Sequence, residues 1–212
     1  NSIYVSDGYA LNKFFNDAGF LVGTEIALRL KGLVLLPLLT RHLGAANYGI
    51  WAQVALIVGL VGPLIASGLE SASSRFLPGL DKEERRAQFS AVTAYMLVGS
   101  AIFAVLLWLA SDSLAEWLLS DPGQANFVVL AGLLTVTGFA IQIARLHLRI
   151  SGQARLYGIS NVVQSVLNAV AVVLVLVHDG DVTDVISWTI GADAILGVVL
   201  LVYIVIRGGL GA

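Results

Sequence analysis

The sequence predicts an all-α integral membrane protein, a helical bundle with six transmembrane helices. Of its 212 residues, 58% are hydrophobic and only 12% are charged, whereas a soluble domain has about 25% charged residues. The apolar residues gather in six blocks, each close to the roughly 20 residues that a helix needs to cross about 30 Å of hydrocarbon. The blocks are continuously apolar rather than alternating, which favours helices over the strands of a membrane barrel.

The blocks give the order of the expected elements. We expect spans at about residues 20–40, 50–69, 88–110, 125–145, 156–177 and 185–206. Together they form one six-helix lobe over residues 20–212, and an N-terminal segment at 1–19 precedes it. Tyr9, Lys13 and Phe14 suggest a short interfacial helix for this segment, although a disordered leader is equally compatible with it.

Loop residues mark where the later spans begin. Asp81, followed three positions later by Glu84, is a variant of the capping box and predicts the start of the third span. "SDSLAEWLLSD" at 111–121 predicts a short amphipathic helix at the outer interface, and "SDPGQ" at 120–124 predicts the turn before the fourth span. Four tryptophans near outer ends are expected to anchor the bundle in the membrane interface: Trp51, Trp108, Trp117 and Trp188.

Glycines recur inside the predicted spans. In membranes, small residues let helix backbones approach closely, because lipid supplies no hydrophobic force between helices. We therefore expect close helix contacts at Gly59, Gly62, Gly132, Gly138, Gly191 and Gly197.

The distribution of lysine and arginine predicts the orientation in the cytoplasmic membrane. Cytoplasmic loops carry an excess of these residues. Nine of the 12 cations fall on one side: Lys13, Arg75, Lys82, Arg85, Arg86, Arg145, Arg149, Arg155 and Arg207. The opposite loops hold Arg41 and six acids. Both termini are therefore predicted to be cytoplasmic.

Three charged residues lie inside the first apolar block, at Glu25, Arg29 and Lys31. Glu25 and Arg29 are four residues apart, so they share a helix face and can pair. Burying a charge at the bilayer centre costs at least about 2.5 to 3.5 kcal/mol, and such residues usually face a bundle interior. The pair either has a functional role, with Glu25 as an ion-coupling acid, or is a purely structural ion pair. Lys31 lies on nearly the opposite face and either reaches the interface or meets another helix.

A polar stripe follows the fifth block. Asn161, Gln164 and Asn168 recur at steps of three and four residues and therefore share one helix face. These amides either line a hydrophilic lumen and bind sugar hydroxyls, or bond to neighbouring helices as packing contacts. Asp193 in the sixth block is a second candidate ion-coupling acid, for a proton or Na⁺, or balances the charge of Arg29.

Other classes of site find little support in the sequence. The chain has no cysteine, and its three histidines stand at or beyond block ends without metal-ligand spacing. We expect neither a metal nor a cofactor. The net charge of −2 is too close to neutral to suggest a nucleic-acid partner. The spans contain no pair of acid–base groups suited to catalysis, so we expect no enzyme activity.

The stretch "RLKGLVLLPLLTRHLGAANYGIW" at 29–51 resembles the first-span signature of the polysaccharide transporter family, the lipid-linked oligosaccharide or O-antigen flippases of the MOP superfamily. Its matching residues are Arg29, Pro37, Arg41, Leu43, Gly44, Tyr48 and Gly49. "SGLESASSRFLPG" at 67–79 resembles the end of the second span, with Arg75. "LRISGQARLYGISNVVQSVLN" at 148–168 resembles the entry to the fifth. The similarity covers most of the chain in order.

The resemblance implies a transporter of about 12 to 14 spans, in which two six-helix lobes rock around a central cavity. This chain has one lobe's worth of spans. It is either the N-terminal lobe of a longer protein or a half-size protein that needs a partner lobe. By resemblance, Arg29 faces the cavity and attracts the pyrophosphate of a polyprenyl-linked sugar. Four cytoplasmic arginines either recruit the same headgroup or only determine topology: Arg75, Arg145, Arg149 and Arg155.

The favoured function is one lobe of a flippase that moves polyprenyl-pyrophosphate-linked oligosaccharide across the membrane by alternating access, for cell-surface polysaccharide. Its expected partners are the lipid-linked oligosaccharide, membrane lipids and a second six-helix lobe. The sequence leaves two alternatives open. The first is a multidrug cation exporter of the same superfamily, driven by protons or Na⁺, which requires an acidic cavity. The second is a membrane scaffold subunit that transports nothing.

Overall fold

The computed structural model describes the backbone of residues 3–206 and the side chains of residues 35–206. Within residues 3–206 the chain is entirely helical between its turns and contains no strand. The helices are α1 (Ile3–Ala66), α2 (Leu69–Phe76), α3 (Lys82–Leu109), α4 (Ser111–Leu119), α5 (Ala125–Ile150), α6 (Ala154–Val177) and α7 (Val182–Ile206). Short 3₁₀ turns at Leu77–Gly79 and Pro122–Gln124 lead into α3 and α5.

Between residues 35 and 206, five helical segments are long and apolar enough to cross a membrane. They are Leu35–Ala66, Lys82–Leu109, Pro122–Ile150, Ala154–Val177 and Val182–Ile206. The predicted multi-span helical bundle is therefore confirmed, whereas the count of six spans is not. The difference arises at the start of the chain, where the first two expected spans both fall within α1.

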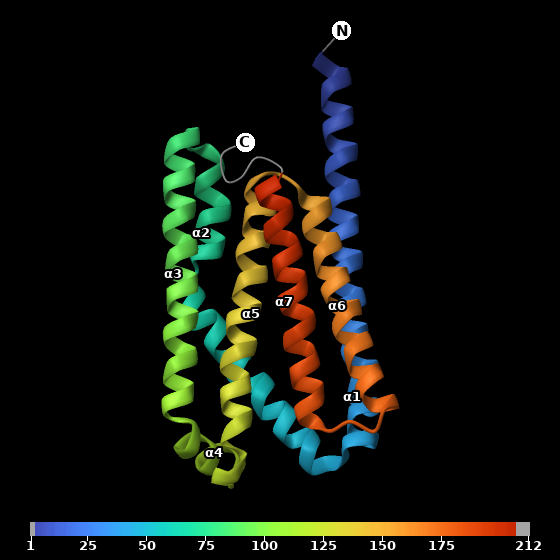
Figure 1. Cartoon of the computed structure of the whole chain (residues 1–212). Helices are drawn as coiled ribbons and strands as arrows, with labels where there is room; N and C mark the ends of the chain where they lie inside the picture. Colours follow the sequence, from blue (N-terminus) through green and yellow to red (C-terminus); the bar gives the residue numbers. More distant parts are fainter. Residues whose placement is uncertain (1–2, 207–212) are drawn as a thin grey trace.

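Gly44 divides α1 into two parts. Its φ of 76° and ψ of 168° are not helical, and a positive φ of this kind is readily adopted only by glycine. In Figure 1 the chain turns at the end of the bundle where α4 lies, and the later part of α1 runs back across the other helices toward α2. The expected spans at 20–40 and 50–69 lie on either side of Gly44.

Local signals in the sequence correctly located several boundaries. The Asp81 side chain accepts a hydrogen bond from the backbone N–H of Glu84 at 2.9 Å, as an N-cap residue should. The amphipathic segment forms α4, and the predicted turn forms the Pro122–Gln124 element, where Asp121 accepts from the N–H of Gly123. Residues 3–19 are helical and continuous with α1, and their place at the membrane interface remains a prediction.

The basic loops gather at one end of the bundle. Figure 1 shows that α2, the start of α3 and the connection between α5 and α6 lie at the same end as the beginning of α1 and the end of α7. The turn at Gly44, helix α4 and the connection between α6 and α7 lie at the opposite end. The loops that are rich in lysine and arginine therefore lie at one end, and the acidic loops lie at the other, as the sequence predicts.

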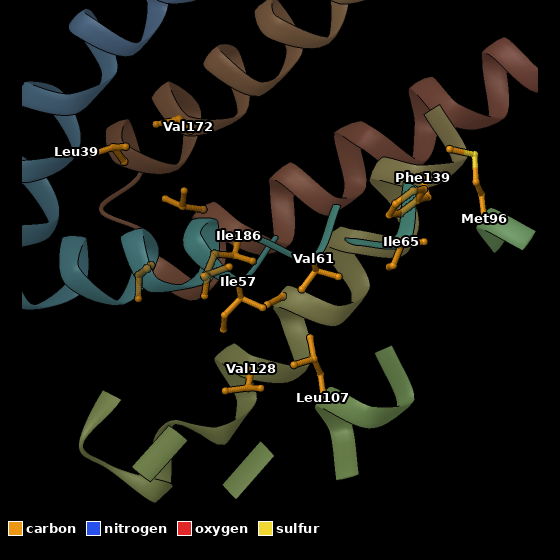
Figure 2. Close-up of a cluster of buried hydrophobic side chains, with 14 of the residues drawn as sticks. Leu39, Ile57, Val61, Ile65, Met96, Leu107, Val128, Phe139, Val172 and Ile186 are labelled. Carbon is orange, nitrogen blue, oxygen red and sulfur yellow. The ribbon is translucent and has the colours of Figure 1, made fainter. Parts of the chain in front are cut away.

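Helix α5 stands at the centre of the bundle, because it packs against α1, α2, α3, α4, α6 and α7. Its buried side chains include Val128, Thr135 and Phe139. The apolar core continues onto the later part of α1, where Ile57, Val61 and Ile65 face inward (Figure 2). Helix α5 therefore contributes to the core on several of its sides, and the other helices are arranged around it.

The tryptophans divide into two groups. Trp108 and Trp117 are 61% and 79% exposed, and Trp188 is also exposed, as expected of side chains at a membrane interface. Trp51 differs, because it packs against the core and stacks on Tyr48 with ring centroids 5.9 Å apart. Trp51 is half-buried and does not project from the bundle as the other three do, and its role as an interface anchor remains a prediction.

The expectation for the glycines holds at one close contact and fails at four positions. A Cβ atom at Gly132 would lie 3.2 Å from the Cα of Ala104, so α3 and α5 approach closely there. Gly197 makes ordinary contact, at 3.6 Å from Ala140 and Ile141. Among the described residues, and apart from the backbone of the glycine's own helix, no atom lies within 4 Å of a Cβ built at Gly59, Gly62, Gly138 or Gly191. At these four positions glycine leaves space instead of bringing backbones together.

We predict that Gly132→Leu destabilises the protein by about 1 to 3 kcal/mol, because the new side chain must displace the backbone of α3. Gly191→Leu is the matched control, since the same change meets open space there. Unfolding by dodecyl sulfate in mixed micelles measures both. Equal stability of the two variants would show that the contact between α3 and α5 is not tight.

Candidate functional site

Two cavities lie along the inner side of α5. The first, which we call the polar cavity, has a volume of about 290 Å³ and is bordered by the later part of α1, by α2, α5 and α6. The second, the aromatic cavity, measures about 340 Å³ and includes Tyr48 and Trp51 in its wall. Leu134 lines both, so the two cavities adjoin along α5.

Glycines help to form the polar cavity. Gly62 of α1 and Gly138 of α5 both line it, and neither has an atom within 4 Å of its Cβ position. A Cβ atom at either position would therefore meet open space among the described residues. The glycines that failed to bring helices together thus account for part of the cavity.

Three polar side chains and one arginine meet at the mouth of the polar cavity, at the basic end of the bundle. We call Glu70, Gln142, Arg149 and Tyr157 the Glu70 cluster. Gln142 Nε2 donates to Glu70 Oε2 at 2.6 Å, and Arg149 Nη1 forms an ion pair with Glu70 Oε1 at 3.1 Å. Arg149 Nη2 donates to the Tyr157 hydroxyl at 2.7 Å, with the guanidinium 4.7 Å from the ring centroid. The cluster joins α2, α5 and α6.

Arg145 lies one helical turn deeper in the same wall. Its Nε donates to the Ser160 hydroxyl at 3.1 Å and its Nη2 donates to the Ser160 carbonyl at 2.8 Å. Ser160 in turn donates to the carbonyl of Tyr157, which fixes the hydroxyl as an acceptor for Arg145. These contacts hold the guanidinium at the cavity while no described side chain accepts from its Nη1. Within residues 35–206, Nη1 is thus the nitrogen of this guanidinium that could donate to a ligand.

The polar stripe of α6 divides among three surroundings. Asn161 lines the polar cavity, and Asn168 lines the aromatic cavity. Gln164 Nε2 donates to Asp193 Oδ1 at 2.9 Å, which joins α6 to α7. Asp193 is only 5% exposed. The stripe thus serves both of the roles that the sequence left open, a cavity lining and a contact between helices.

Asn168 has a buried acceptor without a partner. Among the described residues, its Oδ1 atom is buried and receives no hydrogen bond. A buried polar atom of this kind costs free energy unless a donor reaches it. The aromatic cavity therefore suits a ligand or water that presents an N–H or O–H group.

The remaining predicted residues lie elsewhere. Arg75 is exposed, with its guanidinium 5.7 Å from the ring centroid of Phe76, and Arg155 is also exposed. Neither of them lines the polar cavity or the aromatic cavity. The side chains of Glu25, Arg29 and Lys31 lie outside the part of the chain whose side chains the structure describes. Of the four candidate headgroup arginines, Arg145 lines the polar cavity, and Arg149 stands beside it through its ion pair with Glu70.

Sequence reasoning missed Glu70, Gln142 and Tyr157. Glu70 is the acid of "SGLESASSR", on the side of the membrane that carries most of the cations. That location was a usable signal, because an acid among basic loops is a natural partner for arginine. Gln142 and Tyr157 gave no such signal, since each is a single polar residue beside apolar ones.

Among the described residues, two charged side chains line the polar cavity, Arg145 and Glu70. The negative charge of Glu70 is paired with Arg149, which stands beside the cavity and does not line it. Arginine presents a planar fork of donors that fits the oxygens of carboxylate and phosphate groups. Within residues 35–206, no three histidine, aspartate or glutamate side chains lie together as metal ligands would. Guanidinium and amide groups such as those of Arg145, Gln142 and Asn161 are able to bind anions and hydroxyls.

A family model described as polysaccharide biosynthesis protein matches residues 14–210. The chain belongs to this family. It comprises the polysaccharide and O-antigen flippases of the MOP superfamily, so the resemblance noted in the sequence is confirmed. The family is one of transporters and flippases rather than a class of enzymes. No curated protein and no solved structure matches the chain. With its apolar helices, this family member is a multi-pass membrane protein.

We predict that Gln164→Leu lowers the stability of the protein by about 0.6 to 1.7 kcal/mol, the range of hydrogen bonds between membrane helices. The substitution removes the bond to Asp193 and leaves a buried carboxylate oxygen without this donor. Unfolding in mixed micelles measures the change. Ser165→Ala, at the neighbouring position of α6, is the control and should have a smaller effect. A loss no larger than that of the control would mean that the Gln164 bond adds nothing.

Proposed function

We propose that the chain forms one lobe of a flippase that moves polyprenyl-pyrophosphate-linked oligosaccharide from the cytoplasmic to the outer leaflet. The observation that carries the proposal is the polar cavity, which is lined by Arg145 and by Glu70, whose charge is paired with Arg149. Its lining includes α2 and parts of α5 and α6, and α2 and the connection between α5 and α6 lie at the basic end of the bundle. The lipid tail would stay in the bilayer while the polar head enters the cavity. Both termini would then be cytoplasmic, by the excess of lysine and arginine at this end.

The pyrophosphate would bind at Arg145. Ser160 holds this guanidinium in place, and one of its nitrogens faces no acceptor among the described side chains. A fixed guanidinium loses little conformational entropy when it binds a phosphate oxygen. Arg29 is proposed as a second phosphate contact by its place in the family signature.

The sugar would follow the amides of α6. Asn161 and Asn168 line the two adjoining cavities at the two ends of the stripe. Amide side chains both donate and accept hydrogen bonds, as sugar hydroxyls do. The aromatic pair of Tyr48 and Trp51 adds flat apolar surface beside Asn168.

Transport by alternating access needs a second lobe, which we propose is supplied either in the same longer chain or by a partner subunit. An ion gradient would drive the rocking through Asp193 or Glu25. The bond between Gln164 and Asp193 supports this role for Asp193, because a change of protonation or Na⁺ binding at the carboxylate would alter the contact between α6 and α7.

The rival function, a cation exporter, is less well supported by the charges. A cavity for cationic drugs would need an excess of carboxylates, whereas Glu70, the carboxylate that lines the polar cavity among residues 35–206, is already paired with Arg149. Asp193 is buried at a helix contact. Efflux of cationic dyes that depends on Asp193 and not on Arg145 would favour the exporter.

We predict that Gly138→Leu lowers export of the lipid-linked oligosaccharide at least about tenfold, because the new side chain fills part of a cavity of about 290 Å³ without a backbone clash. Gly59→Leu is the matched control: it also has open space at its Cβ, but it does not line the polar cavity. Export is measured with the intact protein in cells that lack their own copy, and micelle unfolding confirms that both variants fold. Undiminished export by folded Gly138→Leu would exclude the polar cavity as the substrate path.

A further inference from the structure

The carboxylate of Glu70 is bound as a ligand would be. Its two oxygens have separate donors on α5: Gln142 reaches Oε2 at 2.6 Å and Arg149 reaches Oε1 at 3.1 Å. The side chains of Arg149 and Glu70 are 37% and 24% exposed, so water and solutes can reach the pair. The donors therefore form an accessible anion site that an internal carboxylate now fills.

The two arginines are held in position independently of Glu70. Tyr157 of α6 accepts from Arg149 Nη2 at 2.7 Å, and its ring lies 4.7 Å from the guanidinium. Arg145, one turn away on α5, is fixed by Ser160. If Glu70 departed, these contacts would still hold both arginines, and the Gln142 amide released from Glu70 would complete a receptor for an anion. Such a receptor suits a pyrophosphate better than a carboxylate, because the pyrophosphate brings more negative charge and more acceptor oxygens to the same donors.

The element that carries Glu70 is joined to the bundle by a bend. Ser67 and Gly68, between α1 and α2, both have positive φ, of 45° and 73°. Helix α2 has eight residues, and its N-terminus lacks a side-chain cap. Ser74, one turn after Glu70, lies at 3.5 Å from the same Arg149 nitrogen. The polar side chains that hold α2 against α5 therefore converge on the Glu70 cluster.

We infer that the pyrophosphate group of the substrate displaces Glu70 from Gln142 and Arg149 and thereby releases α2 from α5. The inference rests on the proposed function and adds an entry site and a movement to it. The Glu70 carboxylate excludes weakly binding anions from Gln142 and Arg149. Pyrophosphate takes the place of this carboxylate, and no covalent bond is formed or broken. The exchange couples arrival of the charged headgroup to opening of the cavity wall, since Glu70 itself lines the polar cavity.

A single thiol on α2 reports the release. The chain has no cysteine, so Ser73→Cys introduces the only one, at a position that is 2% exposed. We expect pyrophosphate to speed maleimide labelling of this thiol at least about fivefold, which corresponds to local opening made easier by ~1 kcal/mol. The intact protein is tested in nanodiscs of neutral lipid, with sulfate at matched ionic strength as the comparison anion.

Further variants separate the anion site from general loosening. In the Ser73→Cys background, Arg149→Gln should label fast and no longer respond to pyrophosphate, because the ion pair is gone. Arg155→Gln is the matched control, since Arg155 is exposed and outside the cluster, and it should keep the response. Equal responses to sulfate and pyrophosphate, or a response that survives Arg149→Gln, would overturn the inference.

Two sources of the pyrophosphate are compared directly. One arm uses soluble inorganic pyrophosphate, and the other uses nanodiscs that contain farnesyl pyrophosphate. Faster labelling in either arm supports the exchange, and the arm that responds identifies the source. The absence of faster labelling in both arms contradicts the inference. Nanodiscs with phosphatidylglycerol control for general negative charge, and an equal response to them also contradicts it.

Direct binding tests the same point without a new thiol. Glu70→Gln removes the competing charge, so inorganic pyrophosphate should bind this variant about tenfold more tightly than the unaltered protein, as measured by calorimetry. Unchanged affinity would show that Glu70 does not compete. The two proposals can fail separately. If the protein responds to pyrophosphate but exports no oligosaccharide, the flippase proposal is wrong. If it exports oligosaccharide but shows no response to pyrophosphate, the displacement of Glu70 is wrong.

Discussion

Polar side chains inside an apolar bundle must find partners within it, since lipid offers none. Three such pairings connect consecutive parts of the chain. Glu70 joins α2 to α5, Arg145 joins α5 to α6 through Ser160, and Gln164 joins α6 to α7 through Asp193. Apolar packing alone would leave these helices free to slide, because lipid is as apolar as the side chains. The pairings fix the order and the register in which the helices surround α5.

The same constraint explains why the cavities lie where they do. Polar groups that stay unpaired in lipid are costly, so Arg145 of α5 and the amides of α6 face the interior of the bundle, and small residues keep space there. Gly62 and Gly138 leave the polar cavity open at the depth where Arg145 and Asn161 face it. Elsewhere α5 packs tightly, as at Gly132 against Ala104. One central helix thus combines a tight contact on one side with a vacant space on another.

The sequence was informative about single elements and much less so about which elements meet. Apolar blocks located the later spans, and Asp81 and "SDPGQ" located two helix starts, because each signal acts over a few neighbouring residues. The spacing of Asn161, Gln164 and Asn168 predicted their shared face, yet it could not show that Gln164 meets Asp193 while the other two line cavities. Glycine composition likewise cannot distinguish a close contact from an empty space. Trp51 was placed at the interface from its position near a span end, which could not show that it packs against Tyr48 and the core.

The three polar connections differ in burial, and this difference indicates which of them can change. Asp193 is 5% exposed and lies deep between α6 and α7, so breaking its bond leaves a buried carboxylate without that donor. The ion pair of Glu70 and Arg149 is partly exposed, and water can satisfy both groups when they separate. Its helix, α2, is short and follows two residues of positive φ. A movement that begins at the basic end therefore costs less free energy than one that begins at Asp193. In the proposed flippase, the charged headgroup of the substrate would arrive at that same end, where the ion pair of Glu70 and Arg149 is accessible.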